Sequence, residues 1–390
     1  MTEPCAAPKA LLLSAYDAQS HAYWRRQLSE GLQQWQWTQL SLAPRYFSWR
    51  QRGNSLSWAF NQRETLQQNY QFLLATSMVD LSALRGFVPE LSRLPTILYF
   101  HENQFAYPKS AKQHSLLEPQ LTSIYSALCA DRLIFNSQYN QQSFLSGAKK
   151  LLKAMPDNVP KGLLELLSSK SELIPVPIAA ATISDNVRST KPGVLRILWN
   201  HRWEYDKGPD RLLALIQTLQ AKLVALPVDR RPSIEWYIVG QSFRQVPPEF
   251  EQIKKLLSAH DSPMKLAAWG YQECLESYRA LMAAADVVLS TAEHDFQGLA
   301  VLEACSYGCL PLLPNRLVYP EWFAKECCYQ SGDIEQEARD LAVRVLDMAL
   351  CRAAGQTLEV AKAAVDFSWS SLGPRYLRCI TELLEGDSPE

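Results

Sequence analysis

The sequence predicts an α/β protein of two domains, each built on a parallel, Rossmann-like sheet. Short apolar runs alternate with longer segments of helical pattern, and this alternation occurs in two successive series. Repetition of strand, helix and strand predicts parallel sheets with helices on both faces. The length of 390 residues exceeds one ordinary core, and the apolar fraction of 47% is that of a globular protein.

The expected strands are the short apolar runs. In the first series they fall at 10–14, 72–76, 96–100, 132–136 and 173–176, and in the second at 195–200, 234–239, 287–290 and 310–313. Helical patterns lie between them, notably at 113–130, 209–226, 249–260 and 273–285. Because the second series repeats the strand–helix order, we expect it to form a second Rossmann-like domain.

The boundary between the domains is expected in the polar stretch 177–195, which carries Pro192-Gly193. Residues 1–185 would form the first domain and residues 186–366 the second. The segment 367–390 is expected to be a final helix that packs back on the first domain.

Composition narrows the class of protein. The net charge is −1, so any nucleic-acid site would have to be a local patch. No apolar run approaches the ~20 residues of a membrane span, and the N-terminus lacks a signal-peptide pattern, so we expect a cytoplasmic protein that does not bind membranes. The nine cysteines include no C-x-x-C pair, which indicates reduced thiols and no metal site.

A basic loop follows the first strand of the second series. It reads WNHRWEYDKGPD and places Arg202 and Lys207 at a carboxyl strand end, where open α/β sheets bind ligands. A guanidinium beside an ammonium suits a diphosphate. Gly208-Pro209 is typical of a helix start. Taken alone, the loop could also be a solvated basic turn.

An acidic loop follows a later strand of the same series, within HDFQGLAVLEACSYGCLPLL. Glu303 would lie one and a half turns into a helix, where a carboxylate can accept hydrogen bonds from a ribose diol. Asp295 could reach sugar hydroxyls, or it could simply cap the helix. Anion-binding amides are expected around the helix start, at Phe296, Gln297, Gly298 and Leu299.

The base of a nucleotide would lie near two further strand ends of this domain. Gly240 ends one strand, and Trp269-Gly270-Tyr271 forms the other loop. The ring of Trp269 or the neighbouring amides could contact a purine edge. An equally good interpretation is that Trp269 belongs to the core.

The first domain also carries polar side chains at its strand ends. His101, Glu102 and Asn103 directly follow one strand, Asn136 ends the next, and Ser20 and His21 follow the first. In the proposed architecture these groups face a cleft between the domains. His101 could hydrogen-bond a sugar or steady a leaving phosphate, although a single His is usually structural.

The stretch 31–63 contains no acidic residue and combines arginines with aromatic rings. Such a combination suits single-stranded or looped RNA, which needs phosphate neutralisation and base stacking. The alternative interpretation is that the aromatic rings belong to the core and that the basic side chains are simply solvated. The candidates for contact with an RNA are Arg45, Trp49, Arg50 and Arg52. A second acid-free stretch, 132–156, carries Lys149, Lys150 and Lys153.

The basic and acidic loops together resemble the donor site of retaining GT-B glycosyltransferases. In that superfamily the first loop holds the donor diphosphate, and the second places one carboxylate near the sugar and one on the ribose. The resemblance implies a GT-B fold and roles for Arg202, Lys207, Asp295 and Glu303. The family usually has Glu where this chain has Asp295, so the reach is one methylene shorter.

Longer motifs make the resemblance closer. LAPRYFSWRQRG, YFHENQFAYP, FNSQYNQQSF, LWNHRWEYDKGPD and HDFQGLAVLEA, taken in order, are similar to the tRNA-queuosine mannosyltransferase family. The resemblance implies GDP-mannose as donor, the cyclopentenediol of queuosine in a tRNA anticodon as acceptor, and no cofactor or metal. One departure is the loop before Ser20-His21, which reads Asp17-Ala18-Gln19 where the family carries Gly-Gly.

Three alternatives stay open from the sequence. The first is a GT-B enzyme with another acceptor, such as a glycan, a lipid or a small molecule. The second is a sugar-nucleotide epimerase with the same pair of sheets. The third is a non-catalytic RNA-binding relative. Exposure of Arg50 and Arg52, as opposed to burial in ion pairs, would favour RNA.

Overall fold

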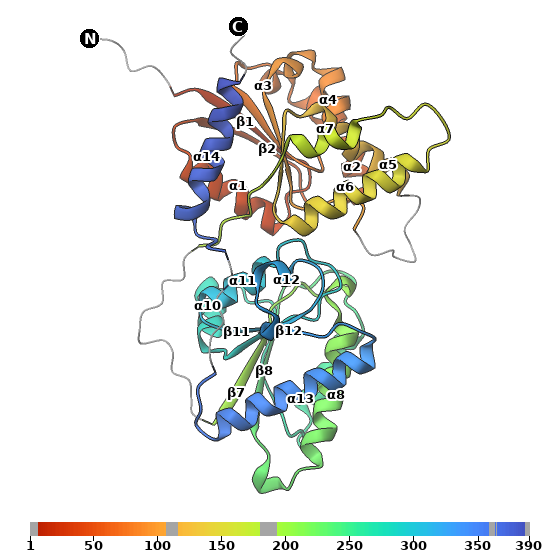
Figure 1. The fold of residues 1–390 in the computed structure, drawn as a ribbon. Coiled ribbons are helices and arrows are strands. Elements are labelled where there is room, and N and C mark those ends of the chain that lie inside the picture. Colours follow the sequence, from red (N-terminus) through yellow and green to blue (C-terminus); the bar gives the residue numbers. More distant parts are fainter. Residues whose placement is uncertain (1–6, 107–115, 180–192, 359–362, 364, 387–390) are drawn as a thin grey trace, which may run out of the picture. The chain divides into compact units, whose positions relative to one another are not determined.

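The computed structural model describes residues 7–106, 116–179, 193–358, 363 and 365–386. It divides into two compact units, residues 1–177 with 366–390 and residues 178–365. Each unit holds one six-stranded parallel sheet with helices packed on it (Figure 1). The expected α/β class is therefore confirmed. Most of the expected boundary stretch, 180–192, lies outside the described residues.

The N-terminal unit has the strand order β2-β1-β3-β4-β5-β6. Its strands are β1 (Lys9–Ser14), β2 (Gln36–Ser41), β3 (Phe72–Thr76), β4 (Thr96–Phe100), β5 (Arg132–Phe135) and β6 (Ser171–Leu173). Its helices are α1 (Gln19–Gly31), α2 (Phe47–Asn61), α3 (Arg63–Leu66), α4 (Leu81–Phe87), η1 (Pro89–Arg93), α5 (Leu117–Cys129), α6 (Gln138–Lys153), α7 (Leu163–Ser169) and α14 (Trp369–Glu385).

The C-terminal unit has the strand order β12-β11-β10-β7-β8-β9. Its strands are β7 (Val194–Trp199), β8 (Ser233–Val239), β9 (Lys265–Gly270), β10 (Val287–Leu289), β11 (Leu310–Pro314) and β12 (Cys328–Tyr329). Its helices are η2 (Tyr205–Lys207), α8 (Pro209–Val224), η3 (Val228–Arg230), α9 (Glu249–Ser258), α10 (Leu275–Ala284), α11 (Leu299–Ser306), α12 (Tyr319–Trp322), η4 (Lys325–Cys327) and α13 (Ile334–Ala353).

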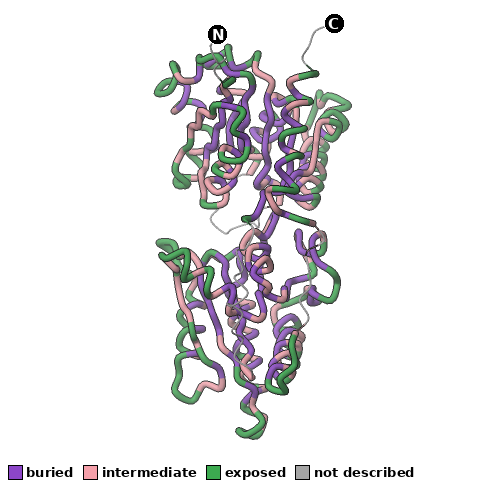
Figure 2. The backbone as a smooth tube through the Cα atoms, turned by 90° about the vertical axis from the view of Figure 1, so that its left-hand side faces the viewer, coloured by how far each residue is buried: buried purple, intermediate pink, exposed green. Residues whose placement is uncertain are grey.

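The central strands are buried on both faces because helices cover both sides of each sheet. Every residue of β3, β4 and β10 is buried, and buried backbone runs through the middle of each unit in Figure 2. Continuous apolar runs are typical of such strands, since no face is left for water.

The missed strands lie at or near sheet edges. β2 was not expected because its sequence, QWTQLS, is mostly polar and only partly buried as the outermost strand. β9 and β12 were missed for the same positional reason. β6 begins two residues before the expected run at 173, and the apolar residues after it continue as buried coil.

The C-terminal helix α14 packs beside α1 in the N-terminal unit (Figure 1). The indole of Trp24 donates a hydrogen bond of 3.1 Å to the hydroxyl of Tyr376, which itself donates to the carbonyl of Pro175 at 2.9 Å. The last residues of the expected helix, 387–390, lie outside the described part of the chain.

Each sheet has a point where its strand order reverses. In the N-terminal unit it lies between β1 and β3, and in the C-terminal unit between β7 and β10. At such a point the loops that leave neighbouring strands diverge, which opens a crevice at the carboxyl edge. No helix in the described residues is long and apolar enough to cross a membrane.

Candidate active site

The basic loop after β7 presses against the acidic loop after β10. Gly208 adopts a φ of +65°, and a Cβ at this position would lie 2.2 Å from the carbonyl oxygen of Thr291. The hydroxyl of Thr291 donates to the Lys207 carbonyl at 2.8 Å and accepts a hydrogen bond from the indole of Trp199. Only glycine allows this close approach, which brings the two loops predicted from sequence together.

Lys207 is the centre of the C-terminal site. Its ammonium donates to the carbonyl of His294 at 2.6 Å and lies 3.4 Å from a carboxylate oxygen of Asp206 and 3.7 Å from one of Asp295. Its side chain is only 9% exposed. A buried ammonium held by two carboxylates has a fixed position, so it can meet an anion without reorganisation.

Arg202 lies on the more accessible side of the same loop. Its guanidinium pairs with Glu204 at 2.7 Å and approaches Asp206 at 3.9 Å, and its side chain is 44% exposed. The structure thus brings Arg202 and Lys207 together around one buried carboxylate. Arg202 has room to turn toward a ligand, whereas Lys207 is locked.

Asp295 is tied to the start of α11. One carboxylate oxygen accepts from the N–H of Gly298 at 2.9 Å, and the other accepts from the Tyr319 hydroxyl at 3.1 Å. Burial raises the pKa of Asp295, but the Lys207 ammonium and the Gly298 N–H lower it, and the result is a pKa below its ordinary value. Asp295 therefore holds the residue that precedes α11 and presents a carboxylate that stays ionised at neutral pH.

Glu303 lies within α11 and is half-buried. The hydroxyl of Tyr278 on α10 donates to it at 3.5 Å, and Asn200 donates to the same hydroxyl oxygen at 2.9 Å. Asn200 also bonds to the carbonyl of Ala300 at 2.9 Å, which fixes the first turn of α11. Burial raises the pKa of Glu303 above its ordinary value, although the Tyr278 hydrogen bond opposes this.

Two further titratable groups shape the charge of this site. Burial raises the pKa of Asp206, but Lys207, His294 and Arg202 lower it by more. The net result is a pKa well below the ordinary value, so Asp206 stays ionised. Burial and the neighbouring Lys207 lower the pKa of His201 to about 4, so its imidazole is neutral. In the absence of a ligand, the positive charges of Lys207 and Arg202 are therefore balanced by the neighbouring carboxylates.

A buried ion-pair network holds the acidic loop in place. Arg316 donates to the carbonyl of Ala292 at 2.9 Å and pairs with Glu337, which is 1% exposed. Arg211 pairs with Glu337 and Glu293, both at 2.8 Å. Breaking such a buried network by removing one partner is costly, so the loop position is well specified.

The expected base-binding residues divide into framework and surface. Gly240 has a φ of +147°, and a Cβ there would lie 1.8 Å from the carbonyl oxygen of His201. Trp269 packs edge-on against Trp203 at 4.7 Å between ring centroids, so its ring belongs to the core rather than to an open base pocket. Tyr271 is 52% exposed and free to stack on a ligand.

The expected anion-binding segment, 296–299, lies at the start of α11, but not all of its groups are available to an anion. Gly298 adopts a φ of +74° and precedes the helix, while Phe296 and Gln297 are buried and Leu299 is half-buried. The Gly298 N–H is already bonded to Asp295. The amides of the first helical turn therefore remain the groups that can receive a phosphate.

At the carboxyl edge of the N-terminal sheet, two imidazoles stack on each other where the other sheet has a cluster of ion pairs. His101, at the end of β4, stacks on His21 of α1 at 4.1 Å between ring centroids and meets Trp24 edge-on. Burial, and then His21, lower the pKa of His101 well below its ordinary value. Its Nε2 is buried and has no hydrogen-bond partner among the described residues.

Asn103 and Asn136 serve the framework of this edge. Asn103 donates to Asn140 at 2.8 Å and accepts from the N–H of Phe105 at 2.9 Å, while Asn136 donates to the carbonyl of His101 at 2.9 Å. Both are nearly fully buried. The sequence predicted acceptor contacts for them, but their polar groups are used to join the loops after β4 and β5.

The loop that departs from the resembled family is pinned to α1. Asp17 pairs with Arg25 at 2.8 Å, and its N–H donates to the carbonyl of Leu42. Ser20 lies in the first turn of α1 and is half-buried, as is Glu102 after β4. Asp17 thus closes this loop against the helix that carries His21.

The comparisons with known proteins agree with this architecture. Residues 9–178 match the family model described as tRNA-queuosine alpha-mannosyltransferase N-terminal, and residues 185–345 match glycosyl transferases group 1. The chain is 32% identical over 337 residues to a tRNA-queuosine alpha-mannosyltransferase of Drosophila melanogaster, covering 84% of this chain and 85% of that protein. The chain belongs to the tRNA-queuosine alpha-mannosyltransferase family.

Solved structures of glycosyltransferases share the fold of this family member. Sucrose-phosphate synthase of Thermosynechococcus elongatus superposes with a TM-score of 0.64 at 13% identity, over 97% of this chain and 100% of that one. The catalytic domain of starch synthase IV of Arabidopsis thaliana gives 0.63 at 13% identity, with the same coverage. The protein is a glycosyltransferase of GT-B fold, as expected.

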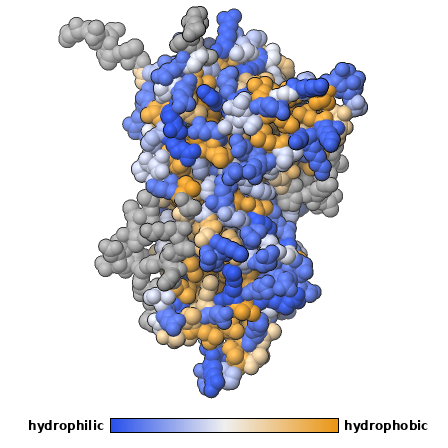
Figure 3. Space-filling model, in the orientation of Figure 1, coloured by the Kyte–Doolittle hydropathy of each residue, from blue (hydrophilic) through white to orange (hydrophobic). Residues whose placement is uncertain are grey.

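The arginine–aromatic stretch of this glycosyltransferase divides between surface and core. Tyr46 and Trp49 are 72% and 53% exposed at the start of α2, and Arg45 lies over the Tyr46 ring at 5.7 Å. By contrast, Trp35 and Trp58 are buried. Apolar side chains also lie among hydrophilic ones on the face of the N-terminal unit drawn in Figure 3.

Two of the arginines in this stretch already have partners within the protein. Arg52 pairs with the buried Asp80 at 2.7 Å and with Glu118 at 3.4 Å, and its side chain is 49% exposed. Arg50 donates to the carbonyl of Ala43 at 3.2 Å and is half-buried. Neither side chain is fully buried, but Arg52 is shared between two carboxylates and Arg50 is half-buried, so their exposure does not decide between the acceptor classes.

Sequence reasoning missed several residues of the C-terminal site. Asp206 and His201 lie inside the basic motif, but no local pattern distinguishes them from solvated polar residues. Tyr278 and Tyr319 come from α10 and α12, and no local pattern marks them. Their roles appear only when these helices are placed beside Glu303 and Asp295.

Proposed function

We propose that the protein transfers mannose from GDP-mannose to the cyclopentenediol of queuosine in tRNA. The observation that carries the acceptor assignment is the match of residues 9–178 to the N-terminal family model, because that unit distinguishes this family from other glycosyltransferases. The mannosyl group is supported by the name of the Drosophila relative. The GDP carrier follows from the same resemblance.

The donor diphosphate would be held by Lys207, Arg202 and the first-turn amides of α11. Lys207 is already fixed between Asp206 and Asp295, and Arg202 is exposed enough to move onto a phosphate. The ribose diol would hydrogen-bond to Glu303, whose orientation is set by Tyr278. Tyr271 would contact the base, since Trp269 is held in the core.

Transfer with retention needs no protein nucleophile. The bond between the sugar C1 and the β-phosphate oxygen breaks, and the acceptor hydroxyl oxygen bonds to C1 on the same face. The hydroxyl proton passes to an oxygen of the departing phosphate, which becomes the β-phosphate of GDP. Catalysis then depends on orientation and on cations that stabilise charge developing on the diphosphate.

His101 would serve as a hydrogen-bonding group and not as a counter-charge. Its lowered pKa makes the imidazole neutral, and Nε2 has no other partner among the described residues. Asp295, ionised beside Lys207, would accept hydrogen bonds from sugar hydroxyls. His101 is thus the neutral hydrogen-bonding group of the N-terminal unit, and Asp295 is the anionic one of the C-terminal unit.

The RNA side of the proposal rests on the start of α2. Trp49 and Tyr46 expose rings that bases can stack on, and Arg45 supplies positive charge beside them, whereas Arg52 is paired with Asp80 and Glu118. Stacking on an aromatic ring contributes about 1–3 kcal/mol per base. Asn103 and Asn136 would act indirectly, by holding the loops after β4 and β5.

The test is incubation of the protein with GDP-mannose and queuosine-containing tRNA, followed by nuclease digestion and nucleoside mass spectrometry. A hexose on queuosine is the expected product, and the same tRNA with guanosine at that position should give none. UDP-glucose in place of GDP-mannose tests the donor separately. Transfer from UDP-glucose only would contradict the donor, and failure with every queuosine substrate despite donor binding would contradict the acceptor.

A further inference from the structure

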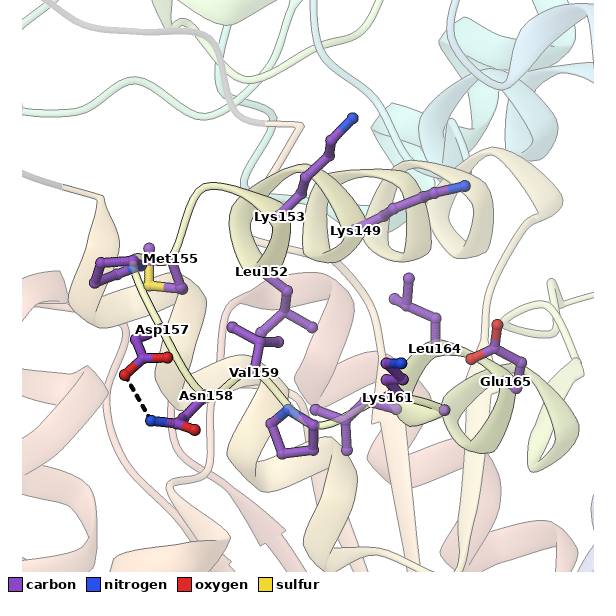
Figure 4. Close-up of a pocket in the computed structure, with 14 residues that line it drawn as sticks. Lys149, Leu152, Lys153, Met155, Asp157, Asn158, Val159, Lys161, Leu164 and Glu165 are labelled. Carbon is purple, nitrogen blue, oxygen red and sulfur yellow. Dashed lines mark hydrogen bonds between the residues drawn. The ribbon is translucent and has the colours of Figure 1, made fainter.

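A basic groove lies at the far end of α6 in the N-terminal unit. It is formed by the end of α6, the loop 154–162 and the start of α7, and it encloses about 590 Å³ (Figure 4). The α6 part of the groove belongs to the acid-free stretch 132–156, whereas the loop residues after 156 and the start of α7 do not. The donor and acceptor features described above do not use it.

The groove combines an apolar floor with a cationic rim. Leu152 on α6 and Val159 in the loop approach each other in Figure 4, with Leu164 of α7 beside them. Lys149 and Lys153 project from α6 away from this floor.

The positive charge of the rim is not neutralised locally. Lys149, Lys150, Lys153 and Lys161 are all exposed, and none forms an ion pair among the described residues. Two carboxylates lie nearby, Asp157 and Glu165, and the first accepts a hydrogen bond from Asn158 at 2.6 Å. The segment 132–156 contains no acidic residue at all.

Stabilisation of the helix end explains only part of this charge. Lys150 and Lys153 lie in the last turn of α6, where cations complement the helix dipole. Lys149 precedes that turn, and Lys161 lies in the loop beyond it. A surface that only capped the helix would need neither.

The groove lies well away from the nucleotide that would be modified. α6 begins after Ser137, which caps it beside Asn136 and Asn140 at the carboxyl edge of the sheet. Lys149 and Lys153 follow Ser137 by 12 and 16 positions, so at 1.5 Å per residue they lie roughly 20 Å along the helix. A single nucleotide held at the carboxyl edge would not reach them.

We propose that this groove binds the sugar–phosphate backbone of the tRNA, several nucleotides away from the modified base. The inference rests on the proposed function, which supplies the polyanion. Unpaired lysines on a rim are suited to phosphates as point charges, and they carry no base specificity. The groove would position the anticodon arm, while the carboxyl edge selects the nucleoside.

The experiment compares two double variants in the full-length protein. Lys149→Gln/Lys153→Gln alters the rim. Lys222→Gln/Lys255→Gln removes the same charge from the last turns of α8 and α9 in the C-terminal unit. The dissociation constant for queuosine-containing tRNA is measured between about 50 and 200 mM salt, because each phosphate contact contributes ~0.9 to the slope of log K against log salt.

The rim variant should lower the salt slope by about 1.5–2 and weaken tRNA binding at least tenfold at about 100 mM salt. The control variant should retain the wild-type slope. The rim variant should also show a raised KM for tRNA with kcat unchanged, and unchanged transfer to a short RNA that contains only the anticodon loop.

The two proposals fail in different ways. If wild-type protein modifies tRNA and the rim variant keeps the wild-type slope and KM, the groove is not an RNA site although the function stands. If both double variants lose the slope equally, the effect is one of net charge, and the groove assignment is overturned. If wild-type protein neither binds nor modifies tRNA, the proposed function fails, and the groove proposal falls with it.

Discussion

The carboxyl edges of the two sheets differ in charge although their architecture is alike. At the C-terminal unit's edge, Lys207 and Arg202 are interleaved with Asp206 and Asp295 within 4 Å. At the N-terminal unit's edge, the corresponding place holds the stacked imidazoles of His21 and His101. The first place is ionic, whereas the second is occupied by imidazoles, with the Asp17–Arg25 ion pair in the neighbouring loop after β1.

This contrast matches the partners expected at each edge. A nucleoside diphosphate gains negative charge as it leaves, so its site needs preorganised cations whose own charge is balanced before the ligand binds. An acceptor hydroxyl is neutral and needs a neutral hydrogen-bond acceptor or donor. Two parallel six-stranded sheets of different strand order therefore support different chemistry, because the side chains at the strand ends determine which ligand is stabilised.

The largest expected effect comes from removing the central cation of the ionic edge. Lys207→Met should lower kcat by about 10²–10³-fold, the loss typical of one preorganised group that stabilises transition-state charge. Lys222→Met, in α8 of the same unit, is the matched control. Single-turnover transfer to queuosine tRNA measures the effect. Wild-type turnover in Lys207→Met would contradict the role of Lys207 in stabilising charge on the leaving diphosphate.

The next effect concerns the neutral histidine within the ionic edge. The pKa of His201 is about 4 in the folded protein against 6.5 in the unfolded chain, so the unfolded state takes up a proton first as pH falls. The free energy of unfolding therefore falls as the pH drops below 7, and the loss due to His201 is about 2 kcal/mol at pH 5. His201→Gln should remove that part of the pH dependence.

Hydrogen exchange of β7, corrected for intrinsic rates at pH 7 and pH 5, reads the stability of this unit. The exposed His260→Gln is the control and should retain the wild-type pH dependence. Asp206 and Asp295, whose pKa values are lowered, should not contribute in this range because they lose their charge only under more acidic conditions. A His201→Gln protein that weakens at pH 5 as much as wild type would contradict the assignment.

A smaller effect is expected on the RNA side of the N-terminal unit. Trp49→Ala should raise KM for tRNA about tenfold, since one lost base–ring stack is worth about 1–3 kcal/mol. Donor affinity should not change. Tyr125→Ala on α5 is the control, because this ring is 51% exposed in the same unit. Equal effects of the two substitutions on KM would show that exposed rings in general, and not α2, matter.

The smallest effect should come from Tyr278→Phe. The variant loses the hydrogen bond to Glu303 while Asn200 still holds Ala300, so the donor KM should rise a few-fold, in line with about 0.5–1.5 kcal/mol for one hydrogen bond. Titration with GDP by calorimetry measures it directly. Leu275→Ala, at the exposed start of α10, is the control. An unchanged donor affinity would remove Tyr278 from the ribose site.

Much of the fold could be predicted because buried parallel strands are continuous apolar runs. β3 and β4 were placed to the residue, and β7, β8 and β10 to within one residue at each end. Edge strands such as β2 escaped prediction because a half-solvated strand needs no apolar run. The site was predicted in part, since Arg202, Lys207, Asp295 and Glu303 belong to two loops that the sheet order brings together.

The sequence by itself determined the α/β class, the family and the residue types at the strand ends, because these depend on local pattern and motif. Only the tertiary structure decided which side chains are held and which are free. It buries Lys207 between carboxylates, turns Asn103 and Asn136 into framework, and leaves Trp49 exposed while Trp58 is core. The reason is that burial and pairing depend on groups far apart in the chain, whose distances no local pattern contains.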